Sequence, residues 1–160
     1  MTSTQAPRSA TEQLRLDAAI ADLVDRQISF NQLLGLKLQS IRPRFELRFE
    51  MRPELVGHAH YGRLHGGVIS SAMDVAAGCL LISALGDKHP AESSDQVMHR
   101  FLRMGTIDMR VDFLRQGVGR HFIASAEVTR LGGRVGSTQM RLVNDEGLLI
   151  ATAAGSYIVS

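Results

Sequence analysis

The stretch GRLHGGVISSAMDVAAGCLLISALG, residues 62–86, holds the residue types in this sequence that are best suited to chemistry. His65-Gly66-Gly67 leads into a long apolar segment, and Asp74 lies near the middle of that segment. An unpaired buried carboxylate costs several kcal/mol or takes up a proton, so a carboxylate among apolar and small residues needs a reason. Asp74 is therefore the first candidate for a catalytic residue.

The two glycines have a chemical use if a helix begins there. The first amides of a helix lack partners within the helix and lie at the positive end of its dipole. Glycines let a ligand approach such amides closely. These amides can polarise a carbonyl and hold the oxyanion that forms when it is attacked, and losing one donor lowers the rate roughly 100- to 1000-fold. On spacing alone, close packing against a strand explains the glycines equally well.

The spacing limits how these residues can cooperate. Gly66 and Asp74 are eight residues apart, which is about 12 Å along a helix axis, too far for one reacting carbon to touch both. His65 and Asp74 are nine residues apart, so about 900° of rotation puts them on opposite sides of the helix and excludes an intrachain dyad. If both groups act on one substrate, the site is shared between two copies of the chain across a symmetric dimer interface.

The surrounding segments predict the elements that must position these residues. A helix is expected over 9–28, strands over 36–41 and 44–51, and an excursion or lid with some helix over 86–104. The remaining sequence predicts four strands at hairpin spacing: 106–115, 121–130, 134–144 and 148–160.

This order of elements predicts an α+β fold, in which a curved antiparallel sheet wraps around one long hydrophobic helix. The sheet is expected to cover that helix almost all round, because the helix lacks a polar stripe. In the strand 106–115, alternation places Ile107, Met109, Val111 and Phe113 on one face.

Length and composition predict one globular domain. The chain has 160 residues, of which 44% are hydrophobic and 21% are charged. We expect a disordered N-terminus over 1–8 and a single domain over 9–160. The single cysteine, Cys79, excludes an intrachain disulfide and fits a reducing compartment. The first residues lack the pattern of a secretory signal, so the expected location is the cytoplasm.

Charge and hydropathy argue against nucleic acid and membrane as partners. The formal net charge is +2, the aromatic content is 5%, and no long basic run is present. A nucleic-acid surface usually shows a basic stripe or stacking aromatics. Residues 66–85 are long enough to suggest a membrane span, but an aspartate in the middle of a bilayer costs about 3 kcal/mol. A buried core helix is expected instead.

Four segments resemble the hotdog-fold acyl-CoA thioesterases of the phenylacetyl-CoA thioesterase type. They are FNQLLGLKL, LHGGVISSAMDVAAG, RMGTIDMRVDFLRQG and VTRLGGRVGSTQMRLVNDEGLLIATAAGSYIV. The likeness is greatest to the bacterial branch that acts on medium- and long-chain acyl-CoAs. The resemblance implies a hotdog fold, hydrolysis of acyl-CoA to free acid and CoA, and dimers or dimers of dimers. It also implies that no metal or separate cofactor is used, because coenzyme A is part of the substrate.

The resemblance also implies roles for individual residues. Asp74 matches the catalytic carboxylate, as nucleophile or as the base that activates water, and Gly66 matches the glycine whose amide polarises the thioester carbonyl. Thr106 falls where a Ser or Thr assists the acid or the water. His58 lies where the family commonly has an orienting Asn, and His60 competes for that role. The remaining implied site residues are His65 as an anchor of the loop, and Gly67, Val68, Arg130, Gly133 and Arg134 as substrate contacts.

Three other interpretations of these residues are a hydratase, a binding protein and a metal site. An acyl-thioester hydratase of the same fold would need a helical Asp-to-His spacing, but Asp74 is followed by VAAGC. A hotdog protein that only binds acyl-CoA would have no use for the costly carboxylate. A metal site at the histidines 58, 60 and 65 lacks a fixed tetrahedral spacing. Cys79 is expected to be a small core residue rather than a nucleophile.

Overall fold

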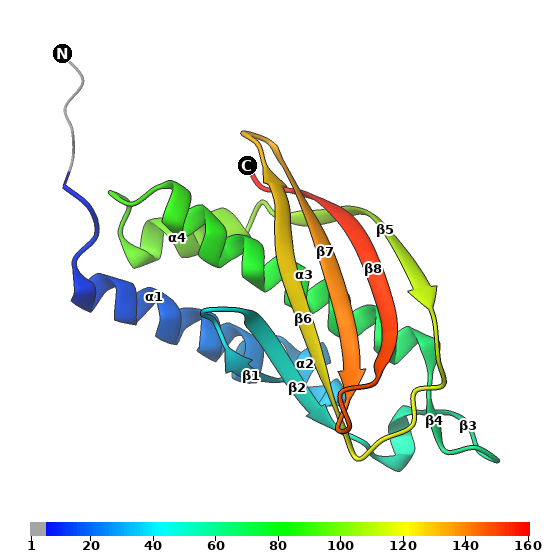
Figure 1. Ribbon diagram of the computed structural model, residues 1–160. Coiled ribbons are helices and arrows are strands. Elements are labelled where there is room, and N and C mark those ends of the chain that lie inside the picture. The colour runs from blue at the N-terminus through cyan, green and yellow to red at the C-terminus, as the bar shows by residue number, and fades with distance from the viewer. Residues whose placement is uncertain (1–5) are drawn as a thin grey trace.

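A computed structural model describes residues 6–160 and shows one antiparallel sheet over a long central helix (Figure 1). The helices are α1 (Ala10–Asp22), α2 (Ser29–Leu34), α3 (Gly66–Lys88) and α4 (Ser94–Phe101), with a π-helical segment at Leu23–Gln27 and a 3-10 turn at Pro53–Leu55. The strands are β1 (Lys37–Ser40), β2 (Phe45–Glu50), β3 (Val56–His58), β4 (Arg63–Leu64), β5 (Gly105–Phe113), β6 (His121–Leu131), β7 (Val135–Asn144) and β8 (Leu149–Ile158).

The main sheet has six strands in the order β1-β2-β6-β7-β8-β5, and all neighbours are antiparallel. Hairpins join β6, β7 and β8, whereas β5 follows α4 and forms one edge of the sheet. The predicted α+β hotdog fold, with its six strands and long buried helix, is thus confirmed.

Alternation in the sequence accounts for the core face of the sheet. In β2, Phe45, Leu47 and Phe49 are all buried, while the residues between them are more accessible. The ring of Phe49 stacks on that of Phe122 of β6, with 5.4 Å between the centroids. These side chains pack toward α3 and form part of one hydrophobic cluster.

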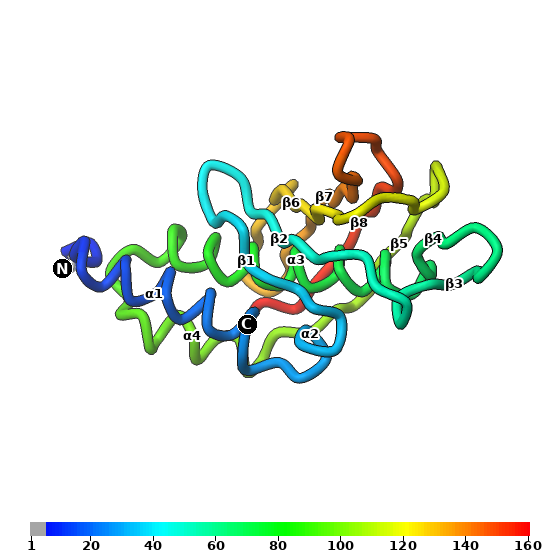
Figure 2. The backbone as a smooth tube through the Cα atoms, turned by 90° about the horizontal axis from the view of Figure 1, so that it is seen from below, coloured from blue at the N-terminus to red at the C-terminus, as the bar shows by residue number. Residues whose placement is uncertain are grey.

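The central helix α3 is covered by more than the sheet. It contacts β2, β5, β6, β7 and β8, and also α1, α2 and α4. Figure 2 shows α1 and α4 side by side along one end of α3. The expectation that the sheet alone covers α3 almost all round is therefore wrong. The sheet shields one side of the helix, and the shorter helices shield part of the other.

The expected alternation in β5 is interrupted. The register to β8 shifts between Thr106 and Asp108, which marks a β-bulge. Ile107 is 54% exposed and Phe113 is 56% exposed, whereas Met109 and Val111 pack against the core. The predicted shared face holds for Met109, Val111 and Phe113, which lie opposite buried residues of β8, and it is wrong for Ile107, the bulge residue. Phe113 is accessible because it ends an edge strand.

The segment before α3 forms more structure than a loop. After the 3-10 turn, β3 and β4 make a two-stranded hairpin, in which Val56 lies opposite Leu64. The amide of His65 donates to the carbonyl of Leu55 at 2.9 Å, and the amide of Leu64 donates to the carbonyl of Gly117 at 2.9 Å. Figure 1 shows this hairpin projecting beyond the main sheet, next to the start of α3.

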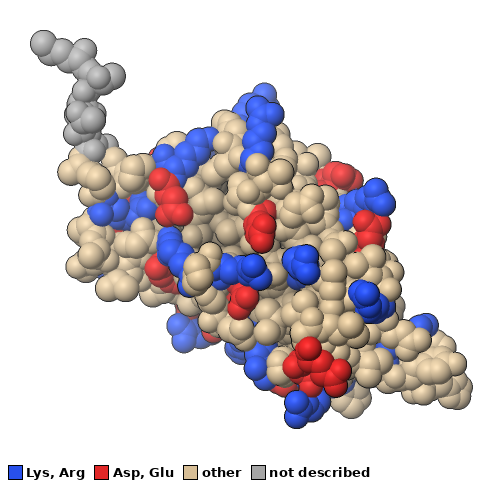
Figure 3. Space-filling model, in the orientation of Figure 1, with Lys and Arg blue, Asp and Glu red and all other residues tan. Residues whose placement is uncertain are grey.

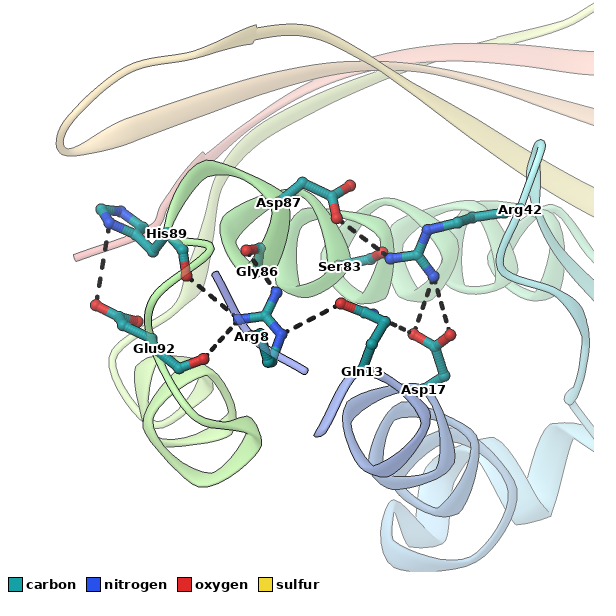
Figure 4. A network of polar contacts seen from close by, with 9 residues as sticks. All are labelled: Arg8, Gln13, Asp17, Arg42, Ser83, Gly86, Asp87, His89 and Glu92. Carbon is teal, nitrogen blue, oxygen red and sulfur yellow. Dashed lines mark hydrogen bonds and ion pairs between the residues drawn. The ribbon is translucent and has the colours of Figure 1, made fainter. Parts of the chain in front are cut away.

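A polar network ties the N-terminal segment to the end of α3 (Figure 4). The guanidinium of Arg8 donates to the carbonyls of Gly86, His89 and Glu92. Arg8 is the last residue of the tail that was expected to be disordered, and these bonds hold it in place. Residues 1–5 of that tail lie outside the described residues.

The hydropathy of α3 and the distribution of surface charge both bear on possible partners. The helix α3 is apolar and long enough to cross a membrane, with a mean hydropathy of 1.9 over 18 residues, but 61% of that window is buried inside the protein. It is the core helix of the domain. In the view of Figure 3, basic and acidic side chains are interspersed, and no field of one sign covers that face.

Candidate active site

Two hydroxyl groups from different strands hold Asp74. Its Oδ1 accepts a hydrogen bond from the Thr106 hydroxyl at 2.9 Å and another from the Tyr157 hydroxyl at 3.0 Å. Within residues 6–160, its Oδ2 accepts no hydrogen bond. This arrangement therefore fixes one oxygen of Asp74 and leaves the other without a hydrogen-bond partner among the described residues.

The bulge in β5 lets Thr106 reach the carboxylate. Thr106 and Tyr157 lie directly opposite each other on β5 and β8. Opposed residues share a face of the sheet, so both side chains point inward toward α3. Strict alternation would put Thr106 on the opposite face from Met109, whose side chain packs against the core. The extra residue, Ile107, removes that conflict.

Asp74 opens into a cavity of about 190 Å³. The walls come from α3, β5, β8, the end of α4 and the residue that precedes α2. The segment 86–104, expected to form an excursion or lid, contributes Phe101 and Met104 to them. Besides Asp74, Thr106 and Tyr157, the lining consists of Ile28, Val75, Gly78, Cys79, Phe101, Met104 and Gly105. The cavity is thus apolar except at the carboxylate and its two donors, which suits an apolar group attached to a reacting carbonyl.

Burial controls the other titratable groups of this cavity. Burial first, and then the charge of Asp74, raises the pKa of the Tyr157 hydroxyl, so Tyr157 stays a neutral donor. Burial, with a smaller contribution from Asp74, raises the pKa of the Cys79 thiol to about 12. Because the thiolate is the nucleophile, the prediction that Cys79 is a core residue is confirmed by this pKa and by its 2% exposure.

The start of α3 has the free amide that the sequence predicts. The His65 ring caps the helix, since its Nδ1 accepts from the Gly67 amide at 2.9 Å. The amide of Gly66 makes no hydrogen bond within the described part of the chain. His65 thus anchors the loop, as expected. Gly67 is exposed and Val68 is half-buried beside it.

Gly66 and Asp74 do not share a cavity within one chain. Gly66 lines a cleft of about 480 Å³ together with Gly57, Phe113 and Gly117, among others. Asp74 is absent from that lining, and Gly66 is absent from the lining of the 190 Å³ cavity. The structure therefore brings Thr106 to Asp74 and leaves Gly66 separate.

The remaining predicted residues form two further groups. His58 ends β3, and its buried Nδ1 has no hydrogen-bond partner among residues 6–160. Its ring lies 4.9 Å from that of Tyr61 and 5.9 Å from that of His60, measured between centroids. These rings belong to the projecting hairpin and do not line the cavity of Asp74.

Arg130, Gly133 and Arg134 lie at the other end of the helix. They belong to the β6–β7 hairpin and are exposed. The Lys88 ammonium at the end of α3 donates to the carbonyls of Leu131 and Gly132 in that hairpin. In one chain the hairpin is thus separated from the start of α3 by most of the length of the helix.

No group of three or more His, Cys, Asp or Glu residues that could hold a metal is present in 6–160.

Tyr157 was not among the predicted site residues, although the alternation of buried positions along the last strand could have indicated it. On β8 the buried positions are 150, 151, 153, 155 and 157, and Tyr157 is the only one of them with a polar side-chain group.

The fold and the site define a class: hotdog proteins with a helix-borne carboxylate above an apolar cavity. The family model of the Thioesterase superfamily matches residues 61–151, and the chain belongs to that family. It is a thioester hydrolase. The chain is 38% identical to the medium/long-chain acyl-CoA thioesterase YigI of Escherichia coli K12 over 152 residues, which cover 94% of this chain and 96% of that protein.

Solved structures agree with this placement. A Shewanella oneidensis protein related to the thioesterase superfamily matches with a TM-score of 0.89 and 35% identity, over 95% of this chain and 100% of that one. The PaaI protein from the phenylacetic acid degradation operon of E. coli matches with a TM-score of 0.68 and 15% identity, over 94% and 95% of the two chains. The second likeness concerns the fold alone.

Proposed function

We propose that this protein hydrolyses medium- to long-chain acyl-CoA thioesters to the free acid and CoA, with Asp74 as the reacting carboxylate. The observation that carries the proposal is a carboxylate that lines an apolar cavity, with one oxygen held by two hydroxyls and the other without a hydrogen-bond partner in the described residues. The likeness to an acyl-CoA thioesterase over nearly the whole chain supports the substrate class.

The free oxygen can act in two ways. As a nucleophile, Oδ2 attacks the thioester carbonyl, the C–S bond breaks, the CoA thiolate leaves, and water then hydrolyses the acyl anhydride. As a base, it takes a proton from a water molecule that attacks the carbonyl directly. An acyl adduct on Asp74, trapped by rapid quench and found by mass spectrometry, would identify the nucleophile. Its absence under single-turnover conditions favours the base.

We propose that the carbonyl is held by the free amide of Gly66 from a second copy of the chain. Gly66 and Asp74 lie in separate cavities of one chain, so a second copy is needed to bring them together. The edge strand β5 supports a specific arrangement, because an unpaired edge readily pairs with another chain. Thr106, the second residue of β5, lies beside Asp74, and Phe113, the last residue of β5, lies beside Gly66.

Antiparallel pairing of two β5 strands about a two-fold axis would place the beginning of one strand beside the end of the other. Gly66 of one protomer would then approach Asp74 of its partner, once on each side of the axis. The half-exposed Ile107 and Phe113 would be covered in the same contact. A further pairing of dimers is compatible with this arrangement.

The other residues receive proposed roles in such a dimer. His58 or His60 on the projecting hairpin orients the reacting groups. Gly67 and Val68 contact the substrate near its carbonyl, and Arg130, Gly133 and Arg134 contact the CoA moiety. We expect that the reaction needs no metal or separate cofactor and that the protein is located in the cytoplasm.

Thiol release from a panel of acyl-CoAs tests the function. Purified protein should release free CoA from medium- or long-chain substrates, and a chelator should leave the rate unchanged. Tight acyl-CoA binding without thiol release would replace the hydrolase with a binding protein. Conversion of an enoyl-CoA to its hydroxyacyl-CoA without thiol release would indicate a hydratase.

A further inference from the structure

We infer that Tyr157 is a positioning residue that selects which oxygen of Asp74 reacts, an inference that rests on the proposed function. The Tyr157 hydroxyl donates to Oδ1 of Asp74 at 3.0 Å and lies 3.9 Å from Sδ of Met140. A thioether sulfur is a weak acceptor, whereas a hydrogen bond to an ionised carboxylate is among the strong ones. The single proton of Tyr157 therefore goes to Asp74.

The two donors act on the same atom rather than one on each oxygen. Thr106 and Tyr157 are cross-strand neighbours on β5 and β8, and both donate to Oδ1. A carboxylate held at one oxygen by two donors cannot rotate without losing both bonds. Oδ2 is thereby kept without a partner within the described structure and is available to the substrate.

Burial makes Tyr157 the more rigid of the two donors. Its side chain belongs to the core and is 2% exposed, whereas Thr106 lies at the accessible beginning of an edge strand. A buried hydroxyl that loses its acceptor carries a desolvation cost, so Tyr157 has no competing state in water. Thr106 can exchange its partner for water. Tyr157 thus sets the position of the carboxylate.

Tyr157→Phe tests this role because it removes the hydroxyl and keeps the buried ring. We expect kcat to fall at least about tenfold with KM changed by less than about threefold, since the substrate contacts remain. We also expect the carbon-13 carboxyl signal of Asp74 to move at a fixed neutral pH, because Oδ1 loses one of its two hydrogen bonds. Ser156→Ala is the matched control, because Ser156 is the preceding residue of β8 and faces the other side of the sheet. It should leave kcat and this signal unchanged.

A wild-type rate in folded Tyr157→Phe would overturn the inference. A lower rate with an unmoved Asp74 signal would overturn it too, because this is the outcome of looser packing alone. If wild-type protein releases no thiol from any acyl-CoA, the proposed function fails separately. The carbon-13 carboxyl signal of Asp74 then tests the hydrogen bond without turnover, and it should differ from wild type in Tyr157→Phe and match wild type in Ser156→Ala. The same signal in all three proteins would contradict the inference.

Discussion

Gly66 and Asp74 stand on the same helix, α3, yet they open into different cavities of the chain. One cavity has the free amide and lacks the carboxylate, and the other has the carboxylate and lacks the amide. In the proposed mechanism, each cavity therefore holds one of the two groups that act on the thioester. The edge strand β5 runs from one cavity to the other and offers its unpaired side to a second copy of the chain.

The shared site predicts that two inactive variants rescue each other. Gly66→Pro removes the amide proton, and proline is tolerated at the first position of a helix. The preceding His65 has φ −66° and ψ 137°, which suits a residue before proline. Gly66→Pro and Asp74→Ala should each be nearly inactive. Refolding them together in equal amounts should restore about a quarter of wild-type activity, because half of the dimers are mixed and each has one intact site.

Differential tags on the two variants locate the restored activity. It should be found in the mixed dimers and be absent from both homodimers. Verified mixed dimers that remain inactive would show that Gly66 and Asp74 do not act in one site.

Asp74→Asn separates catalysis from folding. The amide oxygen can still accept from Thr106 and Tyr157, whose hydroxyls lie 2.9 and 3.0 Å from Oδ1. It cannot supply the negative charge that either mechanism requires. We expect a loss of at least about 100-fold in kcat with an unchanged circular dichroism spectrum. If turnover in this variant is close to wild type, Asp74 has no part in the reaction.

Gly78 should control the length of acyl chain that the cavity accepts. It is one helical turn beyond Asp74 and lines the same cavity of about 190 Å³, and a Cβ atom built there meets nothing within 4 Å. Gly78→Leu should fill this space and lower kcat/KM for long-chain more than for short-chain acyl-CoA. Gly78→Ala is the control, since it adds one methyl group and gains helix propensity of up to about 1 kcal/mol.

The relative kcat/KM values over a chain-length series measure the effect of Gly78. An equal loss for all chain lengths, with the oligomeric state unchanged in gel filtration, would place the acyl chain elsewhere. Loss of the dimer in Gly78→Leu would show that a partner protomer fills the space beside Gly78.

Arg8 should stabilise the domain although it precedes the first helix. Its guanidinium donates to three carbonyls at and beyond the end of α3, where a cation also interacts favourably with the helix dipole. Arg8→Ala should lower the free energy of unfolding by about 1–2 kcal/mol in urea titrations. Arg15→Ala is the matched control, because Arg15 is exposed and pairs only with Glu12 in the described residues. An equal effect of the two substitutions would contradict this role for Arg8.

The sequence determined the elements and the carboxylate. The apolar stretch with one acid predicts α3 and points to Asp74, and alternation in 44–51 predicts β2 with its buried Phe45 and Phe49. The resemblance added Thr106, which alternation alone would have turned to the outer face. The predictions of α3 and β2 succeed because hydrophobic periodicity is a local property that burial enforces along each element.

The tertiary structure decided how the acid is held. Tyr157 reaches Asp74 across 83 positions of the chain, and Thr106 reaches it across 32. The bulge at Ile107 depends on the pairing of β5 with β8, and the separation of Gly66 from Asp74 into two cavities depends on how strands and helices cover α3. Strand register and the face to which a side chain points are set by contacts between distant segments, so no local pattern in the sequence specifies them.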